Sequence, residues 1–352
     1  MKRFGYLYEK VYDMDNLILA HKNARKGKLH YKEVQKIDKD PEKYLNELQI
    51  LLKEKKFKNS KYVVFKKKTD NGKIREIYKL PYFPDRIVHH AIIQITEKIW
   101  KNSLIRDTFS SIKGRGIHDG VRRLTKALRD KENTIYCLKM DISKYYPSID
   151  NDILKEVIRK KIKDNNLLYL LDEIIDSTKG IPIGNYLSQY FGNLYLSELD
   201  HKLKAKHKCY FRYCDDTVIL HKCKFVLHRV KKFIEQYLLK FRKLKLKPNW
   251  QVFPIVIRGI DFLGYRNFHN FKLLRKTIKL KFITLVKNIK LNYQILSKYK
   301  IINGIMSYNG WFKYGNCLNL TRKYVSAEIR QIFTNISMLN NINNPLLNTY
   351  KL

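Results

Sequence analysis

The spacing of apolar residues predicts helices over residues 7–56 of the chain. Residues 15–28 combine an Asp/Asn cap, helical apolar spacing and a closing glycine, and Pro41 opens a second helix. Two short apolar runs, 62–65 and 74–78, then flank the turn residues Asp70-Asn71-Gly72. Because Asn-Gly between two such runs is a strong local signal for a tight turn, this segment predicts a β-hairpin.

Longer helical patterns alternate with short strands over the rest of the chain. Helices are predicted over 85–100, from the basic glycine loop 110–118 to residue 130, within 151–178, and over 186–206 and 224–242. Strands are predicted over 134–140 and on both sides of Tyr213-Cys214-Asp215-Asp216. Residues 276–335 are predicted to be mostly basic amphipathic helix, followed by an Asn-rich tail. Because long helical segments separate the strands, the pattern predicts an α+β fold.

The charge of the chain narrows the class of its partners. The 352 residues, enough for two or three subdomains, include 72 Lys and Arg against 32 Asp and Glu, a net charge of +40. These basic residues are spread along the chain, and 25 Tyr and 17 Phe are interleaved with them. Cations neutralise phosphates and aromatic rings stack on bases, so the composition predicts salt-sensitive binding to nucleic acid. The alternative is a merely basic protein that uses Lys in place of Arg.

The cysteines and the apolar runs exclude several other classes of protein. Five cysteines are scattered without a Cys-x-x-Cys pair, which argues against zinc knuckles and a disulfide framework. The chain contains no run of about 18 apolar residues, so no membrane span is predicted. Acidic residues soon follow the basic first residues, which does not fit the pattern of a signal peptide. We therefore expect a cytoplasmic protein without a membrane partner.

The adjacent carboxylates Asp215 and Asp216 are the strongest candidates for chemistry. They lie where two predicted strands meet, so both side chains can converge on one point. Unpaired, they would repel each other, and a hard divalent cation such as Mg²⁺ is the usual resolution. The alternative is a pair of solvated turn residues. Cys214 between Tyr213 and this pair is interpreted as a small apolar filler of the turn rather than a nucleophile.

Asp141 supplies a third carboxylate at the end of the predicted strand 134–140. If that strand lies against the hairpin, three carboxylates can hold two Mg²⁺ ions for in-line phosphoryl transfer. Taken on its own, Asp141 would be interpreted as a helix N-cap, and the second acidic element is what favours a metal ligand.

Four ordered segments resemble the motifs of the reverse transcriptase family. They are Asp141 with its Tyr-Tyr-Pro-Ser-Ile-Asp continuation, Gly180 to Gln189, Tyr213 to Asp216, and Gly259 to Tyr265. The resemblance extends from about Asp15 to Tyr324. It implies a right-hand polymerase fold of fingers, palm and thumb, with an antiparallel palm sheet and a helical thumb. The corresponding ranges are an N-terminal helical extension (1–60), fingers (61–135), palm (136–270, with a finger-associated insert near 151–185), and thumb with a C-terminal tail (271–352).

The resemblance also implies roles for individual residues of the metal site. Asp141 and Asp215 would be the principal ligands of two Mg²⁺ ions, with Mn²⁺ as an alternative, and Asp216 would support them. The backbone carbonyl of Ile142 would add a further ligand.

The incoming nucleotide has its own implied residues. Arg75 would hold the triphosphate with a bidentate guanidinium. Many relatives carry a lysine six residues before this arginine, where this chain has Thr69, so Lys68 or Lys73 would substitute, or simply be solvated. Tyr146 would close over the sugar and clash with a 2′-hydroxyl, unless it is a core aromatic. Gln189 is assigned to substrate binding as well.

One further segment and one lysine each have two alternative interpretations. Phe262, Leu263 and Gly264 resemble a primer grip that binds primer and template, although an apolar turn is also ordinary core. Lys247 is a candidate for protonating pyrophosphate, or else a solvated lysine.

The loop and the thumb narrow the family further. Ile183-Gly184 and Ser188-Gln189 stand where retroviral and group II intron enzymes usually have Gln-Gly and Ser-Pro. That form, together with the thumb stretch Ser307 to Lys313, looks like bacterial diversity-generating retroelement enzymes and anti-phage defence reverse transcriptases. An apolar Ile in place of Gln removes a hydrogen bond and would loosen base selection.

The expected activity is RNA-directed DNA synthesis with an RNA template, a DNA or RNA primer and dNTPs. A retroelement enzyme would need a small basic accessory protein, and a defence enzyme would need a structured noncoding RNA. A catalytically silent RNA-binding protein with the same fold is the alternative from another class.

Overall fold

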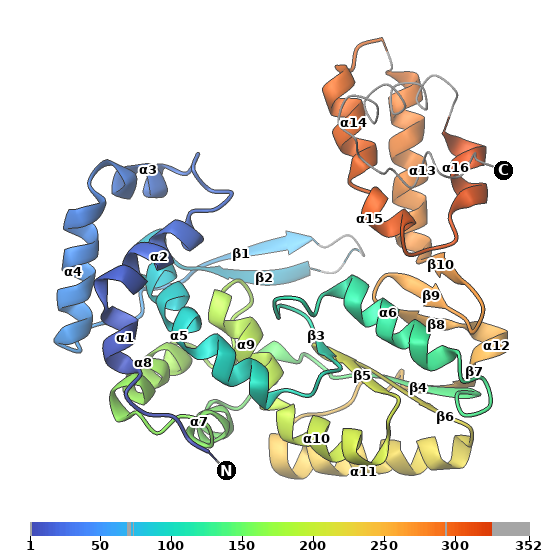
Figure 1. Cartoon of the computed structure of the whole chain (residues 1–352), viewed down its shortest axis with the longest axis horizontal. Coiled ribbons are helices and arrows are strands. Elements are labelled where there is room, and N and C mark those ends of the chain that lie inside the picture. The colour runs from blue at the N-terminus through green and yellow to red at the C-terminus, as the bar shows by residue number, and fades with distance from the viewer. Residues whose placement is uncertain (1, 69–71, 73, 293, 326–352) are drawn as a thin grey trace. The chain divides into compact units, whose positions relative to one another are not determined.

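The computed structural model describes residues 2–68, 72, 74–292 and 294–325 (Figure 1). Lys73, Thr69 and the predicted Asn-rich tail lie outside these residues. The chain forms two compact units, each built from separate segments. The first unit contains residues 1–115, 139–217 and 228–251, and the second contains residues 116–138, 218–227 and 252–352.

The N-terminal helices of the first unit are α1 (Tyr8–Tyr12), α2 (Met14–Ala24), α3 (Lys32–Lys39) and α4 (Pro41–Lys53). Asp13 caps α2 by accepting hydrogen bonds from the N–H groups of Asp15 and Asn16, so this helix begins and ends earlier than predicted. Pro41 opens α4 as predicted, after the capping carboxylate of Asp40. The helix α3 was not predicted separately.

The predicted hairpin is confirmed as β1 (Val63–Lys68) paired antiparallel with β2 (Ile74–Lys79). The N–H of Tyr78 donates to the carbonyl of Ile183, at 2.8 Å, which joins the base of the hairpin to the loop that follows Gly180. An irregular turn (Tyr82–Arg86), in which Phe83 is extended, then leads into the largely buried α5 (Ile87–Ser103). The side chain of Asn16 on α2 donates to the carbonyl of Ala91, at 3.2 Å, and ties these two helices together.

One five-stranded sheet positions the candidate carboxylates. Its order is β3 (Thr108–Phe109), β5 (Tyr210–Tyr213), β6 (Asp216–His221), β4 (Tyr136–Asp141) and β7 (Gln251–Pro254). Only two residues join β5 to β6, so this pair is an antiparallel hairpin. The edge strand β3 pairs parallel with β5 instead, which the sequence did not predict. The order places β4, which ends at Asp141, directly beside β6, which begins at Asp216.

Further helices of the chain lie mainly in the first unit. They are a 3₁₀ turn (Tyr146–Ser148), α7 (Asn151–Arg159), α8 (Asn165–Asp176), α9 (Tyr186–Tyr195), α10 (Ser197–Lys206) and α11 (Lys224–Arg242), whose first residues belong to the second unit. Asp150 caps α7 and Asp164 caps α8. The carboxylate of Asp164 also accepts hydrogen bonds from the N–H groups of Leu7 and Tyr8, so one side chain holds the starts of two helices.

The second unit combines α6 (Ile117–Leu128) with a small sheet and four C-terminal helices. The sheet contains β8 (Ile260–Phe262), β9 (Tyr265–Asn267) and β10 (Lys272–Leu274), all antiparallel, after the short helix α12 (Ile255–Arg258). The helices are α13 (Lys276–Leu291), α14 (Lys298–Met306), α15 (Asn309–Phe312) and α16 (Leu318–Tyr324). Among the described residues, no helix has the length and apolar character needed to cross a membrane.

Candidate functional site

The acidic turn, defined as residues 213–216, is a tight hairpin with an unusual backbone. Cys214 has a φ of 54°, in the left-handed region that residues other than glycine rarely adopt. Its carbonyl accepts a hydrogen bond of 2.8 Å from Nη1 of Arg212, which fixes this peptide. Its Sγ donates to Oγ of Ser110 at 3.0 Å, so the interpretation of Cys214 as an apolar filler is wrong in that respect.

Asp141 and Asp215 converge on one ammonium group. Nζ of Lys247 lies 2.9 Å from Oδ2 of Asp141 and 4.0 Å from Oδ2 of Asp215. The backbone places this lysine, because the N–H of Lys247 donates to the carbonyl of Asp141, at 2.8 Å, and the N–H of Ser143 donates to that of Lys245. The alternative of a solvated Lys247 is therefore wrong. The N-cap alternative for Asp141 is excluded too, since Asp141 ends a strand and Asp150 caps the next α-helix.

Asp216 has a cationic partner of its own that the sequence did not reveal. Nζ of Lys139 lies 2.7 and 2.9 Å from the two carboxylate oxygens of Asp216. Lys139 precedes Asp141 by two residues on β4, so both side chains lie on the same face of the sheet. The alternation of the strand, combined with the strand order β6–β4, could have identified this lysine.

The environment disfavours bare negative charge on the acidic turn. Burial raises the pKa of Asp216 to about 6, although Lys139 opposes that rise. Burial and the nearby charge of Asp141 also raise the pKa of Asp215, while Lys247 and Arg75 lower it. The three carboxylates therefore gain from any cation placed among them.

The donor set of this site fits a hard divalent cation. Asp141 and Asp215 supply carboxylate oxygens to one point, which the ammonium of Lys247 now approaches. The carbonyl of Asp141 points toward the segment that contains Lys247. Because successive residues of a strand direct their carbonyls to opposite sides, the carbonyl of Ile142 is expected to point to the other side of β4, toward β6. In the described part of the chain, no three His, Cys, Asp or Glu side chains already form a metal-binding cluster. Lys139 and Lys247 would have to yield before the carboxylates could close around an ion.

The structure brings Tyr146 to the acidic turn. The hydroxyl of Tyr146 lies 3.6 Å from Sγ of Cys214. Its backbone carbonyl accepts a hydrogen bond of 2.9 Å from the N–H of Ile181. A Cβ on Gly192 would lie only 3.1 Å from the Tyr146 ring, so α9 packs closely against that ring because the residue there is glycine. The half-buried ring is thus fixed beside Cys214 of the acidic turn, and its role at the sugar stays a prediction.

The other residues predicted to bind the nucleotide have fewer contacts with the carboxylates than Tyr146 and the lysines. Arg75 is an exposed residue of β2, and its charge reaches Asp215, whose pKa it helps to lower. Lys73 lies outside the described residues, and Lys68 is exposed at the end of β1. Gln189 is exposed on α9, and no contact among the described residues joins it to the carboxylates.

The predicted primer grip lies in the core of the second unit. Phe262 at the end of β8 is buried, and so are Leu263 and Gly264 in the turn that joins β8 to β9. Gly264 has a φ of 85°, and a Cβ there would lie 2.3 Å from the Trp311 ring. The hydroxyl of Tyr265 donates to the carbonyl of Trp311 at 2.9 Å. The turn is thus packed against the thumb stretch, which matches the ordinary-core alternative, and its contact with primer or template stays a prediction.

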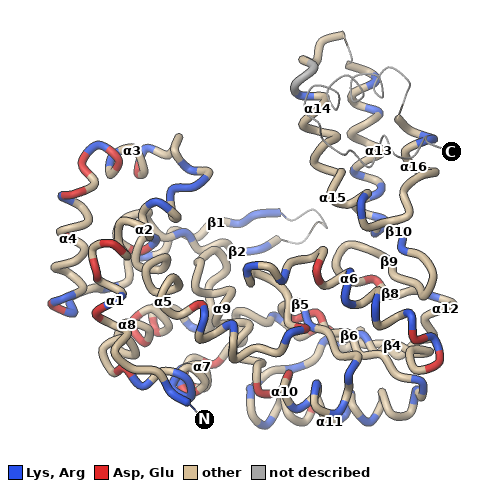
Figure 2. The backbone as a smooth tube through the Cα atoms, in the orientation of Figure 1, with Lys and Arg blue, Asp and Glu red and all other residues tan. Residues whose placement is uncertain are grey.

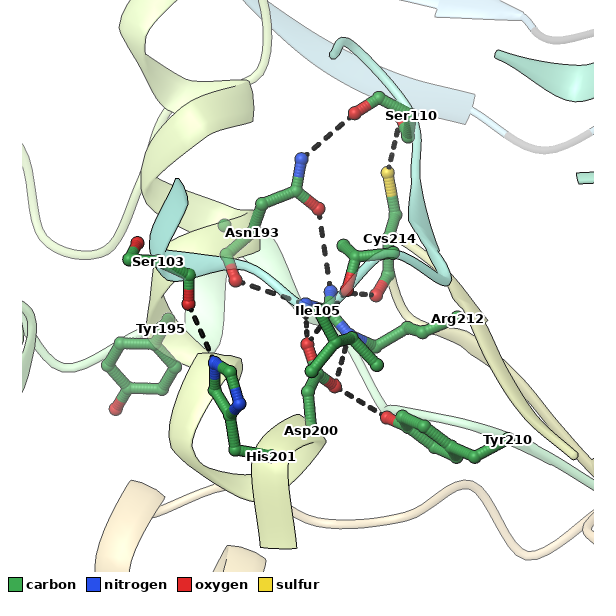
Figure 3. A network of polar contacts seen from close by, with 12 residues as sticks. Ser103, Ile105, Ser110, Asn193, Tyr195, Asp200, His201, Tyr210, Arg212 and Cys214 are labelled. Atoms are coloured by element: carbon green, nitrogen blue, oxygen red, sulfur yellow. Dashed lines mark hydrogen bonds and ion pairs between the residues drawn. The ribbon is translucent and has the colours of Figure 1, made fainter. Parts of the chain in front are cut away.

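A buried ionic network supports the acidic turn (Figure 3). The side chains of Arg212 and Asp200 are 1% and 0% exposed and form an ion pair at 2.5 Å. The guanidinium also donates to the carbonyls of Cys214 and Asn193, at 2.8 and 3.0 Å. The hydroxyls of Tyr210 and Thr108 donate to the carboxylate of Asp200. This network joins α9, α10, β3 and β5 to the acidic turn, and no periodic pattern in the sequence indicates it.

Comparison with known proteins identifies relatives of this arrangement. A family model for reverse transcriptase (RNA-dependent DNA polymerase) matches residues 65–267. Protein YkfC of Escherichia coli (strain K12) is 24% identical over 243 residues, covering 56% of this chain and 64% of that protein. Nuclear intron maturase 1, mitochondrial, of Arabidopsis thaliana is 25% identical over 103 residues, covering 29% of this chain and 14% of that protein. The chain thus spans less than two thirds of either relative.

Solved structures give a weaker likeness. Apo telomerase from Candida Tropicalis has a TM-score of 0.49 and 14% identity, and the match covers 81% of this chain and 59% of that chain. A TM-score below 0.5 adds nothing to the family match. That match and the mixed helices and sheet confirm the predicted α+β fold of the right-hand polymerase class. A bacterial relative and an intron maturase are consistent with the predicted bacterial type.

Proposed function

Because the chain belongs to the reverse transcriptase (RNA-dependent DNA polymerase) family, we propose that it synthesises DNA on an RNA template. The reaction is the extension of a primer 3′-hydroxyl by dNTPs. One observation carries this proposal: Asp141 and Asp215 meet at a single cation-binding point with Asp216 alongside. A catalytically silent relative would have no need to keep three carboxylates and their compensating lysines together.

The proposed metal ligands are Asp141, Asp215, Asp216 and the carbonyl of Ile142. Two Mg²⁺ ions bound there would promote ionisation of the primer hydroxyl and neutralise charge on the leaving pyrophosphate. Two lysines of the chain would keep the carboxylates in position for these ions. Lys139 and Lys247 hold the carboxylates in place before the ions bind, at 2.7 and 2.9 Å.

Binding of the nucleotide is assigned to residues around this point. The Arg75 guanidinium takes the triphosphate, with Lys73 as a second cation, and the Tyr146 ring excludes a 2′-hydroxyl. Gln189 and the turn of Phe262, Leu263 and Gly264 are assigned to the nucleotide and to the primer–template, respectively. The fingers, palm and thumb are proposed to occupy residues 61–135, 136–270 and 271–352.

The distribution of charge suits RNA and primer as substrates. Figure 2 shows Lys and Arg positions along helices and strands throughout the described chain rather than at one end. With a net charge of +40, the protein would release many counterions from a nucleic acid strand, so binding should weaken steeply with salt. Affinity is therefore expected to survive the loss of a few carboxylates.

A diversity-generating retroelement is the proposed biological setting, and anti-phage defence with a noncoding RNA is the alternative. Ile183 in place of the usual glutamine supports the first setting, because loosened base selection suits a mutagenic copy. Sequencing the DNA made with co-purifying RNA separates the two. Mutated copies of a template repeat support the retroelement, and repetitive or untemplated DNA supports defence.

Primer extension on an RNA template with Mg²⁺ tests the activity itself. The wild-type protein should extend the primer in a manner that depends on template and on dNTPs. Binding of RNA without any extension would instead assign the chain to the silent RNA-binding class.

A further inference from the structure

We propose that a single-stranded RNA segment binds in a groove formed by α7, α10 and α11, on the first unit. The groove has a volume of about 740 Å³ and none of its lining residues is a candidate carboxylate or nucleotide-binding residue. Its floor is apolar, formed by side chains such as Val157 and Leu194. A cavity of this size is within the range that small ligands occupy, and it can accept one or two nucleotides.

One flank of α11 lines this groove with a row of aromatic rings. Phe233, Tyr237 and Phe241 are spaced one helical turn apart, with centroids 6.1 and 5.0 Å apart for the two successive pairs. Phe233 and Phe241 are 44% and 48% exposed, which is unusual for phenylalanine, whereas Tyr237 is buried. Exposed rings in a row are the surface on which unpaired bases stack, whatever their sequence.

Cations surround these rings. Lys160, Lys161 and Lys202 lie along the groove. The single carboxylate of the lining, Glu198, is already neutralised by ion pairs with Lys160 and Arg242. Among the described residues, the ion pairs of this lining involve Lys160 and Arg242, and none joins Lys161 or Lys202 to a carboxylate. The groove therefore carries uncompensated positive charge beside its stacking surface.

This combination favours a nucleic acid over an apolar protein partner. A protein surface packed on Phe233 and Phe241 would have to desolvate Lys161 and Lys202 without supplying regular anions. A polynucleotide supplies a base for each ring and a phosphate for each ammonium group. RNA is the strand we assign, because the family acts on RNA templates. The groove would hold a stretch of RNA outside the reacting primer–template.

A pair of matched variants of the full chain tests the groove. The groove variant is Phe233→Ala/Lys202→Gln, and its control is Phe225→Ala/Lys232→Gln, which removes an exposed phenylalanine and a lysine from α11 outside the groove. Binding of an oligouridylate of about ten nucleotides is measured by fluorescence anisotropy, without metal or dNTPs. At about 0.2 M salt, the background from the basic surface is reduced.

The groove variant should bind about fivefold or more weakly than the control, since each base stack removed is worth roughly five- to 150-fold. The slope of log affinity against log salt should fall by about 0.7, because Lys202 no longer neutralises one phosphate. The control removes one lysine too, so only a difference between the variants supports the groove. Ultraviolet crosslinking of the wild-type protein should attach uridine within residues 233–241.

Equal affinities of the two variants, or crosslinks that map only outside 233–241, would overturn the proposal. Loss of self-association in the groove variant, with unchanged RNA binding, would assign the groove to a second copy of the chain instead. Thermal melting is used to check that both variants are folded, which their exposed positions favour. Because the assay contains no dNTPs, its failure leaves the proposed polymerase activity untouched.

Discussion

Asp200→Asn leaves the guanidinium of Arg212 buried without a counterion beneath the acidic turn. Both side chains are at most 1% exposed, so water cannot replace the missing carboxylate. Breaking a buried ion pair in this way costs about 3–5 kcal/mol of unfolding free energy. The variant should also lose primer extension, because the Arg212 guanidinium fixes the carbonyl of Cys214 at 2.8 Å. Urea denaturation measures the first effect and the initial extension rate measures the second.

A double variant separates stability from positioning. Asp200→Leu/Arg212→Met removes both charges, so the uncompensated charge disappears and much of the stability should return. The hydroxyls of Tyr210 and Thr108 lose their acceptor, which leaves a residual cost of about 1–3 kcal/mol. Because the carbonyl of Cys214 still lacks its donor, extension should remain well below the wild-type rate, with the loss in kcat rather than in KM for dNTPs. A double variant that regains both stability and full activity would refute the positioning role.

Three shorter predictions concern other parts of the chain. Tyr146→Ala should raise ribonucleotide incorporation, and an unchanged ratio of dNTP to rNTP use would remove its role at the sugar. Gly264→Ala should cost about 1–3 kcal/mol or more in thermal unfolding, because φ is 85° and the Trp311 ring is 2.3 Å from the new Cβ. Gly116→Ala should cost less, because its new Cβ meets no atom within 4 Å and only the N-cap preference for glycine is lost. Burial alone would raise the pKa of Asp164, but hydrogen bonds from Tyr8 and other backbone N–H groups outweigh it and lower that pKa. Its stabilisation is therefore complete above the unfolded value near 3.9 and is lost as pH falls through the lower folded value. Asp164→Ala should cost about 1–2 kcal/mol at neutral pH and less in strong acid, where the protonated carboxyl accepts weaker hydrogen bonds, and a pH-independent difference would contradict this linkage.

Local chemistry made most of the fold predictable. Pro41 after Asp40 marked a helix start, and the turn residues near Gly72 marked a hairpin. The very short strands β3 and β7 were missed, because two to four residues show no measurable alternation. The start of α2 was placed late because Asp13, rather than Asp15, supplies the cap.

The candidate site was predictable only as far as its residues are close in sequence or belong to known motifs. Asp141, Asp215 and Tyr146 were identified, and the structure brings them together. Lys139 and Lys247 were missed or misjudged, because their partners lie 77 and 106 residues away and depend on the strand order. Asp200 and Arg212 are 12 residues apart, and nothing in the sequence indicated that both would be buried as a pair.

The carboxylates of the acidic turn offer the most direct test of the proposed chemistry. Primer extension on an RNA template is compared between wild-type protein and Asp215→Ala/Asp216→Ala, with RNA affinity measured in parallel. We predict that the wild-type protein extends the primer and that the variant does not, while its RNA affinity changes little because the net charge of +40 supplies most of the binding. Equal extension by the two proteins would contradict the assignment of Asp215 and Asp216 as metal ligands.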